Sequence, residues 1–219
     1  MPPPTRETRF VPVPAGESLR IAWPTPNQQL WTAPEKFFAR TRVNPDFGKP
    51  GWTRDCGRRF HRGCDIAPSR STATGQTTIV SFTDCATGKD FTSVEPTWIP
   101  HDEVWAVFPG RITEVVTDES VSDFGRHVVI EHRWPRSNTK FFTLYGHLAE
   151  VGVAASAGVA DSNFGAVPVT LLGHMGQTSR SADARNWMAI APHLHFEVWD
   201  ANGVAYDPVE FLTKFLPQP

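Results

Sequence analysis

Two short histidine motifs constrain this chain more than any other feature of its sequence. The first is His61-Arg-Gly-Cys-Asp65, and the second is His193-Leu-His195. Side chains of an extended strand alternate between its two faces, so His61 and Asp65 point the same way, and Gly63 between them adds no Cβ that would crowd an ion. The same rule predicts that the second motif continues as a strand with two distinct faces. One face carries His193, His195, Glu197 and Trp199, and the other carries Leu194, Phe196 and Val198.

The side chains gathered in this way are of the types that bind zinc. Two imidazoles and a carboxylate are the usual ligands of a catalytic zinc that keeps one position open for water. Either motif alone is better explained by ordinary half-buried strand histidines. Two motifs that each place their donors on one face favour a shared metal centre, and together they predict a zinc hydrolase.

The rest of the pattern predicts a mainly β fold of antiparallel strands. Runs of β-branched and aromatic residues are interrupted by Gly and Pro, which is typical of strands joined by turns. These runs are Val104–Val116, His127–Glu131, Lys140–His147 and Leu194–Trp199. One short helix is predicted at the C-terminus, where Asp207 is the N-cap, Pro208 the first helical residue and Glu210 the third.

Proline distribution separates the N-terminus from the rest of the chain. Half of the 20 prolines lie before residue 51, which disfavours helix there, and residues 1–20 are predicted to form a Pro-rich arm. Residues 21–219 are predicted to form one domain, because a chain of 219 residues suits a single core of ordinary size.

Five sequence blocks resemble, in the same order, those of the lysostaphin-type (LytM-like) zinc endopeptidases. They are Phe60–Pro68, Val107–Val115, His127–His132, Thr143–Leu148 and Pro192–Trp199, within a likeness that extends from about Ile21 to Asp207. The resemblance implies an antiparallel β peptidase domain that holds Zn²⁺ with His61, Asp65 and His195. It also implies catalytic roles outside the ligand set for His147 and His193, and peptides of bacterial peptidoglycan as substrate.

Two segments depart from the compact pattern of that family. An insertion at about 69–103 is rich in Ser and Thr, and its segments 77–83 and 91–94 flank a turn at 86–89, which predicts a β-hairpin. The second is the polar loop 176–192, which carries Arg180, Arg185 and Trp187 directly before the last motif. Both could wall a substrate groove, or both could be neutral surface elaborations.

The chemistry expected of this ligand set is metal-assisted hydrolysis. Zinc lowers the pKa of a bound water and polarises the scissile carbonyl, while a nearby imidazole moves the proton. The sequence does not distinguish whether His147 or His193 is the base and which of them stabilises the oxyanion. Alternation predicts that Tyr145 faces the same side as His147, as a hydrogen-bonding group or, preferably, as a packed aromatic residue. Glu197 could orient an imidazole as a hydrogen-bond acceptor.

Composition disfavours several other classes of protein. A net charge of −2 gives no reason to expect nucleic acid or an anionic membrane as partner, and no apolar run approaches the length of a membrane span. No secretory leader is visible at the start of the sequence. The extracellular, periplasmic or cell-wall location that the resemblance implies would therefore need a leader that has been removed or another export route.

The three cysteines form no metal motif, because no CxxC pair occurs among Cys56, Cys64 and Cys85. An exported protein could form a disulfide from Cys56 to Cys64 or from Cys64 to Cys85, with one thiol left unpaired in either case, whereas in a cytoplasmic protein all three would be small buried hydrophobes. Cys64 should point away from the Asp65 face and pack in the core.

Two functions of different classes fit these observations. The first is a zinc endopeptidase that cuts peptidoglycan stems or cross-bridges. The second is a catalytically silent module of the same fold that binds the wall or activates another hydrolase. Silent relatives generally lose a ligand, and none is lost here, so the enzyme is favoured. A third interpretation keeps the zinc chemistry but makes a Gly-rich protein the target. The sequence does not predict the oligomeric state.

Overall fold

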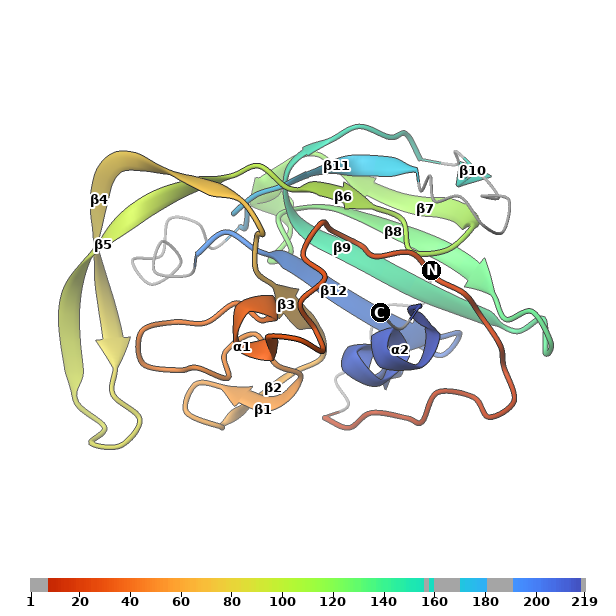
Figure 1. Ribbon diagram of the computed structural model, residues 1–219, viewed down its shortest axis with the longest axis horizontal. Helices are drawn as coiled ribbons and strands as arrows, with labels where there is room; N and C mark the ends of the chain where they lie inside the picture. Colours follow the sequence, from red (N-terminus) through yellow and green to blue (C-terminus); the bar gives the residue numbers. More distant parts are fainter. Residues whose placement is uncertain (1–7, 156–157, 160–169, 181–190, 218–219) are drawn as a thin grey trace.

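Strands dominate the structure, which confirms the predicted mainly β fold (Figure 1). The computed structural model describes residues 8–155, 158–159, 170–180 and 191–217. Its helical segments are α1 (Pro34–Phe37), the 3-10 helix η1 (Glu119–Val121) and α2 (Pro208–Phe215). Its strands are β1 (Gly51–Arg54), β2 (Arg59–His61), β3 (Cys64–Ile66), β4 (Ser71–Thr83), β5 (Asp90–Pro100), β6 (Glu103–Trp105), β7 (Gly110–Val116), β8 (Arg126–Arg133), β9 (Lys140–Val151), β10 (Gly158–Val159), β11 (Leu171–Met175), β12 (Leu194–Asp200) and β13 (Ala205–Tyr206).

A nine-stranded antiparallel sheet forms the centre of the molecule. Its strand order is β10-β7-β8-β9-β11-β6, and β12 joins β9 to β3 and β13. Strand β9 is long enough to have two partners along one edge, because residues 141–146 pair with β12 and residues 148–151 with β11. Position 147 therefore lies where the partner strand changes.

The two faces of β12 differ as its alternation predicts. Leu194, Phe196 and Val198 are fully buried in the main core, which also contains the apolar residues of α2. Trp199, on the other face, packs in a smaller cluster with Val129, Phe142 and Leu144. The face that carries His195 and Glu197 is thus opposite the face covered by α2.

Helix α2 begins as predicted at Asp207. One carboxylate oxygen of Asp207 accepts hydrogen bonds from the backbone N–H groups of Val209, at 2.8 Å, and Glu210, at 3.3 Å. Pro208 occupies the first helical turn, where a missing N–H costs nothing. The cap fixes the start of the helix so that Phe211, Leu212 and Phe215 are buried against the sheet.

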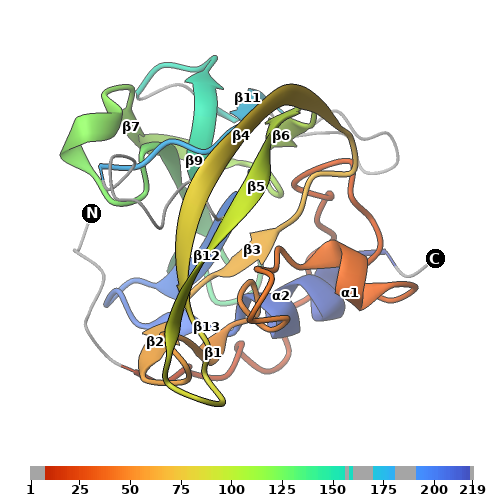
Figure 2. The same cartoon turned by 90° about the vertical axis from the view of Figure 1, so that its left-hand side faces the viewer.

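The predicted hairpin is also confirmed, and it is longer than expected. Strands β4 and β5 form a separate two-stranded sheet that departs from the domain at Ser71 and returns at Pro100. The carboxylate of Asp102 holds the base, since it accepts hydrogen bonds from the backbone N–H groups of Ser69 and Arg70. Figure 2 shows the hairpin crossing in front of β3 and β12, with its tip beside β1 and β2.

A disulfide joins the hairpin tip to the β1–β2 turn. It links Cys56 to Cys85, whereas both predicted pairings used Cys64 and are wrong. Cys64 is a free thiol that points into the core from β3 and is fully buried, as its alternation with Asp65 predicts. Cys85 reaches Cys56 because the long hairpin brings its tip back to the β1–β2 turn.

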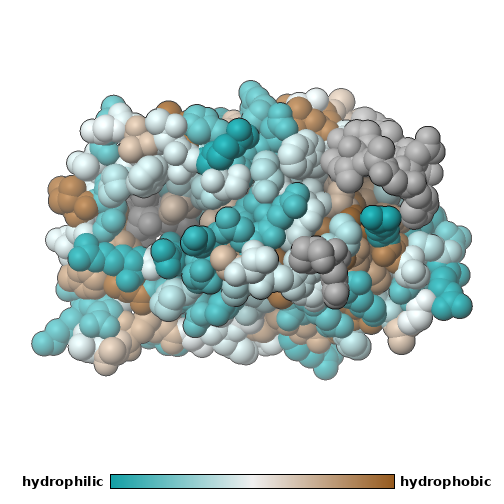
Figure 3. Space-filling view, in the orientation of Figure 1, coloured by the Kyte–Doolittle hydropathy of each residue, from teal (hydrophilic) through white to brown (hydrophobic). Residues whose placement is uncertain are grey.

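The described part of the N-terminal arm lies against the domain. Val11 donates a backbone hydrogen bond to Ala205, and the carboxylate of Glu17 accepts hydrogen bonds from the N–H groups of Arg136 and Ser137. In the space-filling view, apolar surface forms small separate patches, one of them over the hairpin (Figure 3). Within the described residues, no helix has the length and apolar character needed to cross a membrane.

Candidate metal centre

His61, Asp65 and His195 come together although they lie on three different strands. His61 ends β2, Asp65 lies in β3, and His195 lies directly opposite Asp65 in β12. One potential ligand atom from each residue lies within 4.8 Å of the others, and all three residues are buried. The structure therefore brings together the three residues that the sequence proposes as ligands.

Each of the four imidazoles near this centre is oriented by a hydrogen bond at one ring nitrogen. The pairs are His61 Nδ1 with the Lys49 carbonyl at 2.8 Å, His147 Nδ1 with the Thr178 carbonyl at 2.8 Å, His193 Nδ1 with the Ala191 carbonyl at 2.9 Å, and His195 Nε2 with Glu197 Oε1 at 3.0 Å. Carbonyl and carboxylate oxygens act here only as hydrogen-bond acceptors, so each ring carries a hydrogen at that nitrogen and donates it. The second nitrogens of His61, His193 and His195 lie 3.2, 3.6 and 2.9 Å from the carboxylate of Asp65.

His147 reaches this group through a β-bulge. Arg126 of β8 pairs with Leu148 and Val128 pairs with Tyr145, so two residues of β9 oppose one residue of β8. His147 has a φ of +63°, and its ring lies 4.9 Å from that of His193. A bulge of this kind changes the face to which the next side chain points.

The prediction that Tyr145 and His147 share one face is therefore wrong. Tyr145 is fully buried in the main core, and its hydroxyl oxygen accepts a hydrogen bond from the Val107 N–H at 2.9 Å. Of the two roles considered for Tyr145, a hydrogen-bonding group at the site or a packed aromatic residue, the structure shows the second. Strand alternation failed here because it assumes a regular ladder, whereas the bulge at residues 146–147 interrupts it.

Burial and the central carboxylate determine the charges at the centre. Burial opposes ionisation of Asp65, but the nearby Arg54, His61 and His193 and a hydrogen bond from His195 hold its pKa well below the usual value. Burial lowers the pKa of His61 to about 4 and also lowers the pKa of His147 and His193. Burial disfavours the charged form of His195 too, but hydrogen bonds to Asp65 and Glu197 raise its pKa to about 9.

Two further groups at the centre were not predicted from the sequence. The ring of Phe124 stacks on His195 with centroids 5.3 Å apart, and its carbonyl accepts the backbone hydrogen bond of His147. The guanidinium of Arg54 contacts Asp65 and lies 3.0 Å from His61 Nε2. No motif signals Arg54, because its direction depends on the β1–β2 turn, where Asp55 has a φ of +48°.

The centre lies in a groove of about 670 Å³ between the domain and the hairpin. The imidazoles of His61, His147, His193 and His195 line it from the sheet side. Residues 81–83 of β4 line it from the hairpin side, and the disulfide Cys56–Cys85 lies on its boundary. The hairpin is thus a wall of the groove that contains the candidate centre.

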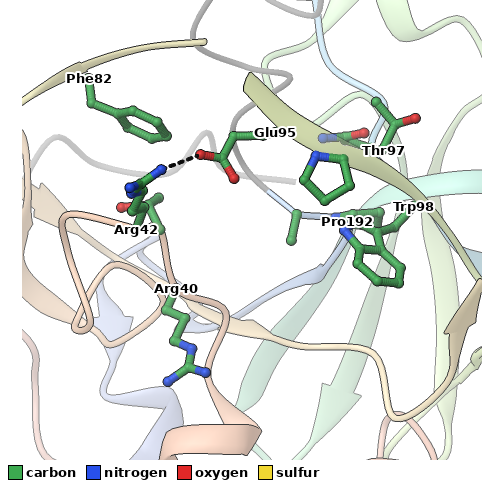
Figure 4. A pocket seen from close by; sticks show the side chains of 11 residues that line it. Arg40, Arg42, Phe82, Glu95, Thr97, Trp98 and Pro192 are labelled. Carbon is green, nitrogen blue, oxygen red and sulfur yellow. Dashed lines mark ion pairs between the residues drawn. The ribbon is translucent and has the colours of Figure 1, made fainter. Parts of the chain in front are cut away.

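A smaller cavity of about 140 Å³ lies farther along the hairpin (Figure 4). In it Arg42 and Glu95 point toward one another at 3.5 Å, and Arg42 also donates a hydrogen bond to Ser93 at 2.7 Å. Trp98 and Pro192 lie on its other side in the same view. These polar contacts connect the middle of the hairpin to the domain.

The remaining predicted residues lie away from the centre. His127 and His132 are buried strand histidines with hydrogen-bond partners, and His132 contacts the Pro109 carbonyl and Thr143. Of the polar loop 176–192, Arg180 forms an ion pair with Asp123 at 2.8 Å. Residues 181–190, with Arg185 and Trp187, lie outside the described residues.

The sequence profile of peptidase family M23 matches residues 86–208, which is more than half of the chain. The chain belongs to peptidase family M23. The family resemblance inferred from the five sequence blocks is thereby confirmed. The matched M23 segment contains His147, His193 and His195, whereas His61 and Asp65 precede it.

Three solved structures are similar to this M23 chain. A chain of the SpoIIIAH and SpoIIQ complex has 21% identity and a TM-score of 0.45, with 88% of this chain and 99% of that chain covered. A zinc-containing peptidase from Vibrio cholerae has 22% identity and a TM-score of 0.37, with 61% and 36% covered. Lysostaphin from Staphylococcus simulans has 18% identity and a TM-score of 0.41, with 80% and 49% covered. The chain thus spans less than half of the length of the last two proteins, and no curated protein sequence was matched.

Proposed function

We propose that this chain is a zinc-dependent endopeptidase that hydrolyses amide bonds in the peptide stems or cross-bridges of bacterial peptidoglycan. The main support is the grouping of the candidate ligands with two further histidines, His147 and His193, along one groove. Membership of peptidase family M23 supports the hydrolytic activity. The five sequence blocks support peptidoglycan as the substrate.

The donors at the centre fit a zinc ion. His61, Asp65 and His195 are of the types that zinc prefers, and the outer nitrogen of each imidazole is already hydrogen-bonded, as is usual for metal-bound histidines. The Arg54 guanidinium between His61 and Asp65 supports the view that the centre favours a cation. These three residues would hold the ion.

His147 and His193 would move the proton in this scheme. Zinc bound at the centre would supply a Lewis acid that polarises the scissile carbonyl and makes water acidic. Burial lowers the pKa of both imidazoles, so both are neutral near pH 7, and either can accept the proton of the attacking water. A protonated imidazole can then donate a hydrogen bond to the oxyanion and return the proton to the leaving amine.

The groove would hold an extended peptide between the hairpin and the β1–β2 turn. Its hairpin wall offers Ser81 and Thr83, and the opposite wall carries the exposed arginines Arg58 and Arg59. The disulfide Cys56–Cys85 supports a location in an oxidising compartment, such as the periplasm or the cell exterior.

Metal content and wall hydrolysis, measured on the same preparation, test this function. We expect close to one zinc per chain by elemental analysis, and loss of turbidity of purified peptidoglycan that stops with a chelator and returns with zinc. New amino termini in the released peptides, identified by mass spectrometry, would locate the bond. Tight binding to peptidoglycan without any new termini would instead favour the silent wall-binding module.

A further inference from the structure

The side chain of Arg54 is placed among the candidate zinc ligands rather than in solvent. Only 6% of the residue is exposed, and its guanidinium lies 3.5 Å from the centroid of the Phe47 ring. One terminal nitrogen contacts Asp65 Oδ2 and lies 3.0 Å from His61 Nε2. The same nitrogen therefore donates to two of the three residues that would hold the metal.

The Nε2 atom of His61 cannot accept a hydrogen bond from Arg54 and bind a metal ion at the same time. A neutral imidazole has one N–H and one in-plane lone pair. The N–H is at Nδ1, which donates to the Lys49 carbonyl at 2.8 Å, so the lone pair is at Nε2. That lone pair accepts the hydrogen bond from Arg54.

The charges of Arg54 and a metal ion also oppose their binding to Asp65 at the same time. The guanidinium compensates the buried carboxylate of Asp65, which has 0% exposure. A divalent ion bound at Asp65 would share this one carboxylate with the guanidinium, and two cations that share a carboxylate repel each other strongly where water is excluded.

We propose that Arg54 competes with the metal for His61 and Asp65, and that its side chain moves into the groove when the metal binds. This inference rests on the proposed zinc centre and concerns its regulation. Arg54 lines the groove, so its side chain has a space to enter, and Phe47, whose ring the guanidinium faces, lines the same groove. The metal affinity of the native chain is then reduced by the fraction of molecules in which Arg54 is engaged.

The first test is the zinc affinity of Arg54→Met, measured by competition with a chromophoric chelator. Methionine keeps most of the length and the packing on Phe47 but lacks the charge and the donors. We expect zinc to bind about 10-fold or more tightly than to the native chain, because the competing state is removed. The matched control is Arg111→Met, which removes the same charge from an exposed residue of β7 that does not line the groove. We expect native affinity for this control.

The second test uses the native chain and needs no variant. Phenylglyoxal modifies accessible arginines, and modified positions can be mapped by mass spectrometry. We expect Arg54 to be protected in metal-free protein and to react after zinc is added, while the exposed Arg111 reacts equally in both states. Equal reactivity of Arg54 with and without zinc, or an unchanged zinc affinity in a folded Arg54→Met variant, would overturn the competition. Absence of zinc binding in the native chain and in every variant would instead refute the proposed zinc centre itself.

Discussion

Gly63 lies so close to His195 that no other residue fits at position 63 without moving the imidazole. A Cβ atom added there would stand 2.6 Å from His195 Cε1 and 2.8 Å from its Nε2. It would also stand 2.7 Å from the backbone carbonyl of Phe196. The glycine between His61 and Asp65 therefore provides space for the third candidate ligand, and not only for an ion.

The variant Gly63→Ala should displace the imidazole of His195 from the other two candidate ligands without removing any of the three. We expect weaker zinc binding, by about 10-fold or more, since disturbing the groups that orient a ligand has effects of that size. Chelator competition and circular dichroism on the same samples would measure affinity and folding. Native zinc affinity in a folded Gly63→Ala protein would contradict the close packing described.

The five histidine and aspartate positions should divide into two classes. We expect His61→Ala, Asp65→Ala and His195→Ala to lose zinc. We expect His147→Ala and His193→Ala to keep zinc but to lose about 10²-fold or more in rate, the usual contribution of a general acid or base. Elemental analysis and initial rates of peptidoglycan clearing distinguish the classes, and zinc retained by His195→Ala would refute the assignment.

The hairpin should determine which substrates are cut rather than whether metal binds. Replacing residues 76–95 with a short Gly-Ser turn, together with Cys56→Ser, removes the groove wall formed by 81–83. We expect native zinc content and a changed set of products from several peptidoglycan types, because walls govern binding more than the chemical step. The double variant Cys56→Ser/Cys85→Ser, with the hairpin intact, controls for loss of the disulfide. An unchanged product pattern would show that the hairpin is a neutral elaboration.

Reducing the disulfide should loosen the hairpin alone. Strands β4 and β5 form a sheet of two strands, and such a ribbon is marginally stable unless it is packed or tethered. We expect the amide hydrogens of β4 and β5 to exchange faster in Cys56→Ser/Cys85→Ser, while those of β8 and β9 keep their native rates. Hydrogen exchange read by mass spectrometry would measure both, and equal protection of the hairpin with and without the disulfide would argue against this tether.

His132 should make the fold sensitive to mild acid. Burial lowers its pKa from 6.5 to about 4, so between these values the unfolded chain binds the proton more readily than the folded chain. Stability should then fall as pH decreases from about 6.5 to about 4, by about 3 kcal/mol at 1.36 kcal/mol per pKa unit. Denaturant unfolding at several pH values would show a smaller decrease for His132→Gln. An identical pH dependence in this variant would exclude His132 as the cause.

The sequence predicted those parts of the fold that depend on local pattern. Alternation in β12 assigned its residues to the correct faces, and the cap at Asp207 placed the start of α2, because both follow from a few neighbouring residues. The hairpin was predicted for the same reason, as Ser/Thr-rich strands around a Gly-containing turn.

What the sequence did not predict depends on contacts between distant segments. The bulge at His147 forms where β9 changes its partner from β12 to β11, and no local pattern records that change. Arg54 and Cys85 reach the groove only because the β1–β2 turn and the hairpin tip meet there. The three candidate ligands were an exception, because a family resemblance supplied the long-range information.

The left-handed backbone conformation of His147 lowers the stability of the folded protein, and it would be less costly with a residue other than histidine. A residue with a side chain costs about 1 kcal/mol in this conformation, and glycine or asparagine bears it more easily. Directed evolution for heat resistance would therefore tend to replace this histidine, and the selected variants would be more stable but would lack one of the two residues that we propose to transfer the proton. Any such library should be screened for turnover and thermal tolerance together.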